Sequence, residues 1–224
     1  MIIGLVGLMG SGKDTAADFL VNFHQFRRDS FAAPLKDAVA AVFGWDRTLV
    51  EGRTKQSRDW REQKDAWWSE RLNQDITPRW VLQQWGTEVC RNSFHPDIWV
   101  ASMEDRLRRT TDSIVITDCR FPNEMRAIKQ AGGFIVQIQR GPLPEWWDRA
   151  VTWNRGDNYG SHPPLTLPHA SEWSWAGSLL IDHVIHNDGS PDDMYNKFNN
   201  LIDILSKKPY TDILDNKELE HENQ

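Results

Sequence analysis

The first twenty residues constrain the fold more than any other stretch of the chain. They begin with the apolar run 2–6, continue through the glycine-rich turn 7–12, and reach Lys13 just before a run with helical spacing, 16–20. A buried strand, a glycine loop, a lysine and a helix in this order are typical of a phosphate-binding P-loop. A glycine turn with a solvated lysine is the alternative, and it explains neither the strand before the turn nor the helix after it.

The loop contains the groups that a phosphate needs. Glycines let the backbone bend tightly and bring several N–H groups close to phosphate oxygens, while the positive end of the following helix dipole points at the same anion. Lys13 adds a mobile charge, and the hydroxyl of Thr15 can bind Mg²⁺. Asp14 stands where such loops usually have Ser or Thr. This Gly-Lys-x-Thr form resembles the loop of nucleoside monophosphate kinases.

Composition favours a small metabolic enzyme. A chain of 224 residues suits one α/β domain with inserted segments, and a net charge of −6 gives no basic field for nucleic acid. Cys90 and Cys119 are far apart and belong to no metal-type cluster, which indicates a reducing compartment. No apolar run reaches membrane-spanning length, and the N-terminus has no signal-peptide pattern. We therefore expect a cytoplasmic protein without membrane or nucleic-acid partners.

Apolar runs further along the chain, and one short stretch with a polar middle at 26–31, predict the other strands of a five-stranded, mostly parallel sheet flanked by helices. The expected strands are 26–31, 113–118, 134–139 and 181–186, in addition to 2–6. A helix is expected over 192–205, because Met194, Phe198, Leu201 and Leu205 fall on one side of it. The sequence predicts that residues 207–224 form a polar tail.

A helix starting near 32 has Leu35, Val39 and Val42 at the spacing of a core stripe. Lys36 lies off that stripe, so a cleft-facing lysine and a solvated one are equally compatible with the pattern. The following stretch, 47–77, mixes both charges with tryptophans. Its acidic residues argue against single-stranded nucleic-acid binding, and a solvated, partly helical flap is expected there.

The stretch 77–91 is predicted to be a helix that Thr77 caps and in which Pro78 takes the first position. Its apolar stripe comprises Val81, Leu82, Trp85 and Val89. A second face carries Arg79, Gln83, Gly86, Thr87 and Arg91. A glycine inside a helix costs about 1 kcal/mol relative to alanine, so we expect Gly86 to permit a close approach, either by a ligand or by a packed helix.

Two further places can bind a ligand. Trp99 shares a helix face with Met103 and Leu107, and that spacing taken alone favours the core over a base-stacking platform. Asp118 follows a buried strand, at the end where open α/β sheets bind ligands, and Arg120 and Glu124 belong to the same strand-to-helix corner. Asp118 can bind Mg²⁺ through water, bind the acceptor together with Arg120, or pair locally with Arg120 to shape the turn.

A long stretch rich in Trp, Pro and Gly, about 141–176, is predicted to be a lid. A lid arginine can neutralise charge on a transferring phosphoryl group, and the sequence does not distinguish Arg149 from Arg155. His162 and His169 have no metal-site partners at suitable spacing, so zinc is not expected.

Taken together, the motifs resemble those of bacteriophage-type deoxynucleoside monophosphate kinases from Gly7 to about Leu205. The motifs that carry the resemblance are GLMGSGKDT, FAAPLKDA, LQQWGTEVCR followed by PDIWV, DCRFPNE, HASE and HNDGS. The stretch 47–77 and the lid match least. The resemblance implies one P-loop kinase domain over 1–206, with an acceptor-binding insertion at about 32–110 and the lid at about 141–176. A phage-encoded member would act in the host cytoplasm.

The same resemblance implies the substrates and the site residues. The activity would be transfer of the γ-phosphoryl of ATP to dTMP, dGMP, dCMP or a modified dCMP. The donor site, for ATP and Mg²⁺, would comprise Gly10, Ser11, Gly12, Lys13, Asp14 and Thr15, with Thr15 on the metal and with Asn187, Gly189 and Ser190 near the adenine. The acceptor site would comprise Lys36, Arg79, Gly86, Thr87, Trp99, Asp118, Arg120 and Glu124. Lys13, Asp14 and Arg120 would be the catalytic residues.

Two rival functions remain compatible with the sequence, and a third, a nucleic-acid-dependent ATPase, is disfavoured by the acidic balance. One is a dephospho-CoA kinase, another small-molecule kinase with a P-loop. The other is a non-catalytic module whose ATP binding drives docking to a partner. The oligomeric state is also open, with a homodimer as one alternative.

Overall fold

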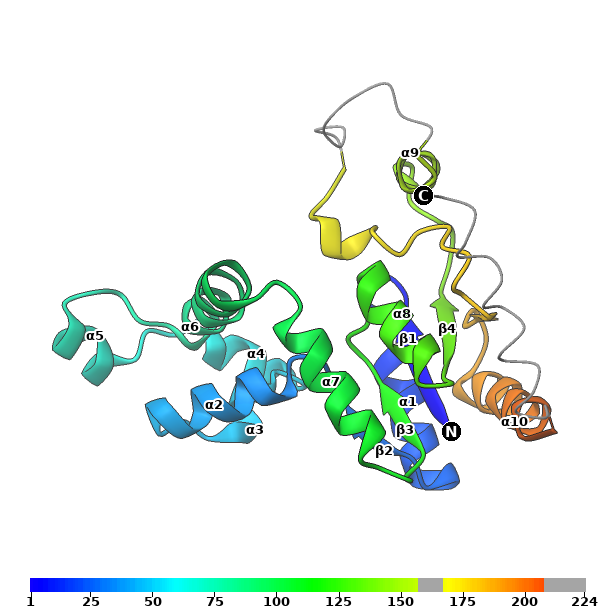
Figure 1. Cartoon of the computed structure of the whole chain (residues 1–224), viewed down its shortest axis with the longest axis horizontal. Coiled ribbons are helices and arrows are strands. Elements are labelled where there is room, and N and C mark those ends of the chain that lie inside the picture. Colours follow the sequence, from blue (N-terminus) through cyan, green and yellow to red (C-terminus); the bar gives the residue numbers. More distant parts are fainter. Residues whose placement is uncertain (157–166, 208–224) are drawn as a thin grey trace. The chain divides into compact units, whose positions relative to one another are not determined.

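A computed structural model describes residues 1–156 and 167–207 of the chain (Figure 1). The chain divides into two compact units, one formed by residues 1–29 and 111–224 and the other by residues 30–110. We call them the sheet unit and the helical unit and describe each by itself.

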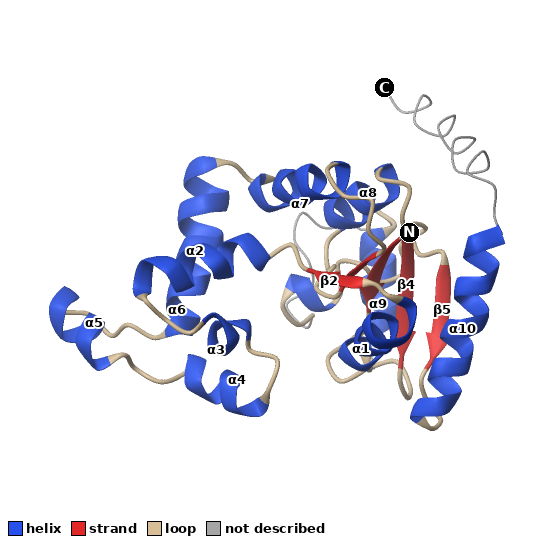
Figure 2. Cartoon of the chain, turned by 90° about the horizontal axis from the view of Figure 1, so that it is seen from below, coloured by secondary structure: helices blue, strands red, loops and turns tan. Residues whose placement is uncertain are grey.

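The sheet unit contains a five-stranded sheet in which every paired neighbour runs parallel (Figure 2). The strands are β1 (Ile2–Val6), β2 (Arg27–Asp29), β3 (Ile114–Ile116), β4 (Phe134–Gln139) and β5 (His183–His186), in the spatial order β2-β3-β1-β4-β5. This confirms the predicted sheet, although β2, β3 and β5 are shorter than expected. The central position of β1 places the loop that follows it at the carboxyl edge of the sheet, where open α/β sheets bind ligands.

Helices cover both faces of this sheet. They are α1 (Lys13–His24) and α10 (Pro191–Lys207) on one face and α8 (Pro122–Gln130) on the other. The sheet unit also contains α9 (Trp147–Asn154) and the 3₁₀ turn η2 (Ala170–Glu172). Ile3 and Leu5 share a core with side chains of α1 and α10. The opposite face of β1 carries Gly4, where an added Cβ would lie 2.6 Å from Ile128 Cδ1 of α8. The missing side chain therefore lets α8 pack directly on the central strand.

The last helix forms as expected, and part of the stretch predicted to be a lid is described. The four residues of the α10 stripe are buried, which confirms that helix. The stretch 141–176 contains α9, and the ring centroids of the buried Trp147 and Trp175 lie 5.1 Å apart, so it has an aromatic core of its own. His162 lies outside the described residues, as do 208–224 of the predicted tail.

The helical unit consists of short helices packed around tryptophans. These helices are α2 (Ala33–Phe43), α3 (Arg47–Glu51), α4 (Lys55–Arg61), α5 (Ala66–Leu72), α6 (Pro78–Gln83), the π-helix η1 (Gln84–Phe94) and α7 (Ile98–Arg108). Buried Leu35, Val39, Ile76 and Val81 contact the rings of Trp45, Trp68, Trp80, Trp85 and Trp99. Helices of five to seven residues bury little surface, and large aromatic rings supply the apolar contact that such helices lack. The high tryptophan content thus has a structural explanation here.

Two details of the predicted stripes are wrong. Val42 is 54% exposed, because the contacts of α2 follow Leu35, Val39 and Phe43, a spacing of four residues that leaves position 42 beside the line. Val89 is 52% exposed, because the expected helix over 77–91 ends at Gln83 and continues as a π-helix. The i→i+5 hydrogen bonds of a π-helix rotate later residues away from the 3.6-residue stripe. The predicted cap is confirmed, since Thr77 Oγ1 accepts a hydrogen bond from Trp80 N at 3.1 Å.

Among the described residues, no helix combines the length and the apolar character that crossing a membrane requires.

Candidate active site

The P-loop adopts a conformation that only glycine permits at two of its positions. Gly7 has φ +152°, and a Cβ there would lie 2.4 Å from the carbonyl oxygen of Ile138 on β4. Gly12 has φ +103°, and its Cβ would lie 2.3 Å from Asn187 Nδ2. Both positions therefore need a residue without a side chain, which keeps the loop tight against the sheet edge.

Lys13 curls back over this loop. Its Nζ donates to the carbonyl oxygens of Gly7 at 2.7 Å and Leu8 at 2.9 Å. Burial is the main cause that lowers the pKa of Lys13, and the positive charge of Arg120 acts in the same direction. Asp14 and Glu172 oppose them, and the net result is a pKa of about 8. The amine is thus held at the loop by two carbonyl oxygens. A bound anion would stabilise its positive charge more than these carbonyl groups do.

The loop also contains a polar atom that a phosphate would satisfy. Ser11 is buried, and its Oγ has no hydrogen-bond partner within the described part of the chain. The loop is anchored from the other side, because Asn187 Nδ2 donates to Ser11 O at 2.9 Å while Asn187 N donates to Gln139 O at 2.7 Å. An unsatisfied buried hydroxyl next to a rigid glycine loop fits a polyphosphate.

The residues predicted beside Asn187 serve mainly the start of α10. Ser190 Oγ accepts from Asp193 N at 3.2 Å, and Ser190 N donates to Asp193 Oδ2 at 2.8 Å. A Cβ on Gly189 would lie 2.5 Å from the same carboxylate oxygen. The structure thus brings Asn187 to the loop and gives Gly189 and Ser190 a capping role.

Asp14 and Thr15 lie on the exposed first turn of α1. The Asp14 carboxylate accepts a hydrogen bond from Arg28 Nη1 at 2.9 Å, and Arg28 also contacts Asp18 at 3.0 Å, so this group ties β2 to α1. The Thr15 side chain stays accessible to a ligand. The described residues contain no cluster of three or more His, Cys, Asp or Glu that could hold a metal ion.

The corner after β3 positions Arg120. Glu124 is almost fully buried, and its Oε2 accepts from the backbone N–H groups of Arg120 at 2.7 Å and Phe121 at 3.1 Å. That carboxylate oxygen is therefore committed to the turn and the start of α8. The direct acceptor contact that the resemblance implies for Glu124 stays a prediction. Asp118, on the same corner, is half-buried.

The guanidinium of Arg120 contacts the predicted lid. Its Nη1 lies 3.3 Å from Ser171 Oγ and 3.4 Å from Glu172 Oε1. The charges of Arg120 and Glu172 both act on Lys13, so the three groups share one electrostatic environment near the P-loop. Glu172 belongs to the HASE motif, and the sequence alone predicted no role for it. Its place in a motif that resembles the family's was the one sign that it lies near the site.

Cys119 is unsuited to nucleophilic chemistry. Burial raises the pKa of its thiol well above the usual value, and the neighbouring Glu124 and Asp118 raise it further. The thiol is therefore protonated at neutral pH and belongs to the core of the corner.

In the helical unit, two of the predicted acceptor residues have carboxylate partners. Lys36 Nζ lies 2.5 Å from Glu51 Oε1, and Arg79 Nε lies 2.6 Å from Glu62 Oε1. Burial acts to raise the pKa of Glu51, but its bonds with Lys36 and Arg47 outweigh burial and bring it below its ordinary value. Lys36 is therefore held in an ion pair, which neither of the two predicted alternatives included.

The close approach expected at Gly86 is confirmed, and the approaching group is protein. A Cβ there would lie 2.8 Å from Leu35 Cδ2, and Trp99 Nε1 donates to Gly86 O at 2.9 Å. Trp99 also packs against the buried residues of the helical unit, so the interpretation from spacing alone describes its contacts well. Thr87 is exposed on the same π-helix.

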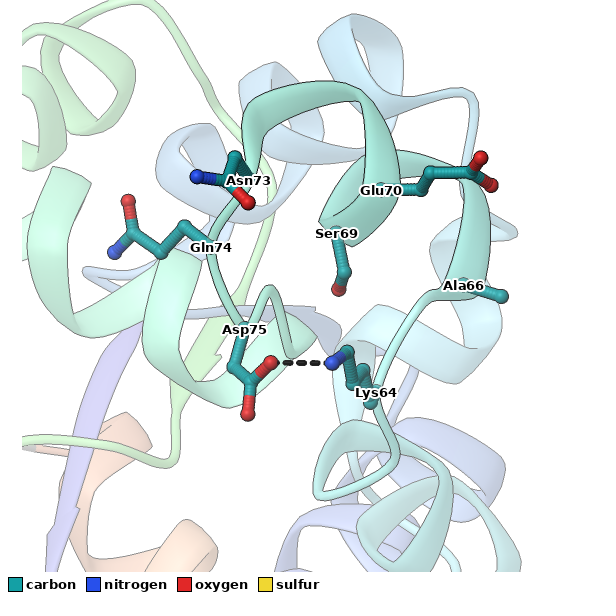
Figure 3. Close-up of a pocket in the computed structure, with 7 residues that line it drawn as sticks. All are labelled: Lys64, Ala66, Ser69, Glu70, Asn73, Gln74 and Asp75. Atoms are coloured by element: carbon teal, nitrogen blue, oxygen red, sulfur yellow. Dashed lines mark hydrogen bonds and ion pairs between the residues drawn. The ribbon is translucent and has the colours of Figure 1, made fainter.

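A separate hollow of about 610 Å³ opens beside α5 (Figure 3). It is lined by Lys64, Ala66, Ser69, Glu70, Asn73, Gln74 and Asp75. Lys64 and Asp75 point toward one another and form an ion pair. None of the predicted site residues lines this hollow, so we do not assign a nucleotide to it.

Comparison with known proteins decides the family. No protein-family model matches the chain. A protein of Acanthamoeba polyphaga mimivirus, which carries the provisional name deoxynucleotide monophosphate kinase, is 31% identical over 154 residues, covering 62% of this chain and 74% of that protein. The chain belongs to the deoxynucleoside monophosphate kinase family. The deoxynucleoside-5′-monophosphate kinase of Escherichia phage T5 is 27% identical over 180 residues, covering 58% of this chain and 72% of that protein.

Solved structures show a weaker likeness. Dephospho-CoA kinase from Campylobacter jejuni has 16% identity and a TM-score of 0.45, with coverage of 92% of this chain and 98% of that one. Shikimate kinase from Aquifex aeolicus has 14% identity and a TM-score of 0.41, with coverage of 92% and 99%. Family membership, carried by the sequence relatives, makes the chain a nucleotide phosphotransferase.

Proposed function

We propose that the protein transfers the γ-phosphoryl group of ATP to the 5′-phosphate of a deoxynucleoside monophosphate from the dTMP, dGMP, dCMP or modified dCMP class. The proposal is carried by the P-loop of this chain, where Lys13 donates to the loop carbonyl of Gly7 and the buried Ser11 hydroxyl has no partner among the described residues. Membership of the deoxynucleoside monophosphate kinase family supports it. The products would be ADP and the deoxynucleoside diphosphate.

The donor phosphates would lie on the loop residues Gly10, Ser11, Gly12, Lys13, Asp14 and Thr15. Backbone N–H groups there would bind phosphate oxygens, and Ser11 Oγ would gain the partner it lacks. Mg²⁺, when bound through Thr15 and the phosphates, would offset negative charge on the transferring group. Asn187 would contact the adenine side of the loop, together with Gly189 and Ser190.

The acceptor would be bound by Lys36, Arg79, Gly86, Thr87 and Trp99 of the helical unit and by Asp118 and Arg120 of the sheet unit. Glu124 would contribute by fixing the backbone of Arg120. In this proposal residues 1–206 form one kinase domain, residues 32–110 its acceptor-binding insertion and residues 141–176 its lid. A homodimer stays a prediction.

The chemistry needs alignment more than proton transfer. A phosphate acceptor is already anionic, so no strong base is required, and the barrier falls through orientation and neutralisation of the transferring charge. Lys13 and Arg120 supply positive charge near the loop. Glu172 and Ser171 hold Arg120 from the lid side, so lid closure would both position this arginine and exclude water that competes as acceptor.

The test is a coupled ADP-release assay across the four common deoxynucleoside monophosphates, with dephospho-CoA as a control acceptor. We expect turnover with at least one of them and none with dephospho-CoA. Lys13→Ala should lower kcat by about 10²- to 10³-fold, because it removes one charge from the transferring group, while the circular dichroism spectrum stays unchanged. A folded Lys13→Ala protein with normal turnover would refute the proposal, as would a preference for dephospho-CoA.

A further inference from the structure

Arg28 of β2 binds the residue after the P-loop lysine at two of its atoms. Its Nη1 donates to Asp14 Oδ1 at 2.9 Å, and its Nη2 donates to the carbonyl oxygen of Asp14 at 2.9 Å. The same Nη2 donates to Oδ1 of Asp18, one turn further along α1, at 3.0 Å. The Arg28 side chain is 18% exposed, whereas those of Asp14 and Asp18 are 73% and 50% exposed. A planar guanidinium suits such a forked contact, which fixes the Asp14 carboxylate in one position.

Asp14 brings a negative charge to a loop that has to receive negatively charged phosphates. It lies in the first turn of α1, directly after Lys13, where such loops usually have Ser or Thr. Burial and the charge of Arg120 lower the pKa of Lys13, whereas the charge of Asp14 raises it. The carboxylate therefore acts electrostatically at the amine that would meet the phosphates. Without compensation, the same charge would repel a polyphosphate.

The neighbouring Arg27 shows what an arginine of this strand does when it serves the scaffold. Its side chain is 49% exposed, and it lies 3.2 Å from Asp112 and 3.7 Å from Asp29, neither of which belongs to the P-loop or to α1. Successive residues of a strand point to opposite faces, so the two arginines are directed to different parts of the sheet unit. Arg28 alone of this pair is directed to the residue beside Lys13.

We propose that Arg28 is a positioning residue of the donor site, which holds the Asp14 carboxylate in place and offsets its charge so that the loop can bind a polyphosphate. The inference rests on the proposed function for the presence of a nucleotide on the loop, and on the three contacts of Arg28 for the role of the arginine. Arg28 itself would touch no substrate and would act through Asp14.

The affinity for ADP, measured by isothermal titration in EDTA, tests this role. Arg28→Gln leaves the charge of Asp14 uncompensated and should weaken ADP binding about 10-fold. Adding Asp14→Asn removes that charge, so the double variant should bind ADP within about threefold of the wild type. An arginine that only linked β2 to α1 would give a double variant at least as weak as Arg28→Gln, and that result would overturn the proposal.

Two further variants control for the position of the charge. Arg27→Gln should leave the affinity for ADP within about twofold of the wild type. Adding Asp18→Asn to Arg28→Gln removes a charge that lies about 5 Å further along the helix, and it should restore less affinity than Asp14→Asn does. Equal restoration by the two asparagine substitutions would contradict a role that acts through Asp14.

Arg28→Lys takes the place of Arg28→Gln if the glutamine variant does not fold. Lysine keeps the charge but cannot bind two atoms of Asp14 with a rigid fork, so we expect a loss of ADP affinity of about threefold. Adding Asp14→Asn should again remove this loss. A folded Arg28→Lys protein whose loss persisted in the double variant would count against the proposal.

Steady-state kinetics separate this inference from the proposed function. Arg28→Gln should raise KM for ATP about 10-fold and leave KM for the deoxynucleoside monophosphate within about twofold, because the compensation is lost at the donor loop. The expected pattern of ADP affinities in a protein that phosphorylates no deoxynucleoside monophosphate would keep the role of Arg28 and reject the kinase proposal. Normal turnover with an unchanged KM for ATP in a folded Arg28→Gln protein would keep the kinase and reject the role of Arg28.

Discussion

At the scale of single residues, the charge of Lys13 is the property that a nucleotide would change most. Its amine is partly withdrawn from water, and it exchanges hydration for the two loop carbonyls of Gly7 and Leu8. Carbonyl dipoles stabilise an ammonium group less than full negative charges do. The two carbonyl contacts therefore do not offset the cost of burial, and the pKa of Lys13 stays at about 8. Phosphate oxygens at this position would raise the pKa again.

We therefore expect nucleotide binding to take up protons. At pH 8.5 a group with a pKa of about 8 is mostly neutral, and raising that pKa to its ordinary value near 10.5 upon ADP binding would take up roughly 0.7 proton. At pH 6.5 Lys13 is charged in both states and contributes no uptake. Isothermal titration with ADP in EDTA, repeated in buffers of different ionisation enthalpy, measures this number.

Lys13→Arg is the matched control for proton uptake. Arginine stays charged throughout this range, so the variant should bind ADP at pH 8.5 without the uptake. Equal uptake by the wild type and Lys13→Arg would assign the proton to another group and contradict the role given to Lys13.

At the scale of elements, the corner between β3 and α8 forms where the sequence predicted it, but the sequence did not reveal the hydrogen bonds that Glu124 makes with the backbone there. The sequence indicated a charged corner after a buried strand, and the strand, the corner and the helix all form there. It could not tell that Glu124 turns inward. Glu124 turns inward because the backbone N–H groups of Arg120 and Phe121, just before α8, have no partner within the helix and need a nearby acceptor.

Glu124→Ala should therefore act first on stability. Removing the carboxylate leaves two N–H groups of a largely buried corner unsatisfied, and we expect the free energy of unfolding to fall by about 2–4 kcal/mol. Urea denaturation followed by circular dichroism measures this change. Glu124→Gln keeps one acceptor oxygen and should lose less than half as much. A loss below about 1 kcal/mol for the alanine variant would show that the corner does not depend on this side chain.

At the scale of the whole molecule, the sequence predicted the strands and helices that show regular burial. It missed the contacts between residues that are far apart in the chain. All five strands were predicted, four of them from apolar residues and β2 from a short stretch with a polar middle. The stripe of α10 was correct at every position because regular burial leaves a regular pattern. The π-helix broke the pattern at Val89, since nothing in the 3.6-residue period signals a change of hydrogen bonding.

Ion pairs were equally invisible to pattern reasoning. Lys36 meets Glu51 from another helix, and no spacing along the sequence reveals that partner. The glycine loop between β1 and α1 forms where the sequence predicted it, because the residues that build it are contiguous in the chain. The residues of the acceptor site come from both compact units, and their shared role therefore stays a proposal.

That shared role predicts how a linked ligand should bind. A pentaphosphate chain that joins adenosine to deoxythymidine carries both proposed nucleotides on one molecule, so the second nucleotide would bind at a high effective concentration once the first is in place. We expect its Kd to lie about 10²- to 10⁴-fold below that of ADP.

Adenosine 5′-pentaphosphate is the control, because it has the same number of phosphates and no second nucleoside. It should recover only the part of the gain in affinity that comes from charge. Isothermal titration compares the three ligands. If the linked ligand bound no more tightly than adenosine 5′-pentaphosphate, the donor and acceptor sites would not be close enough for direct phosphoryl transfer.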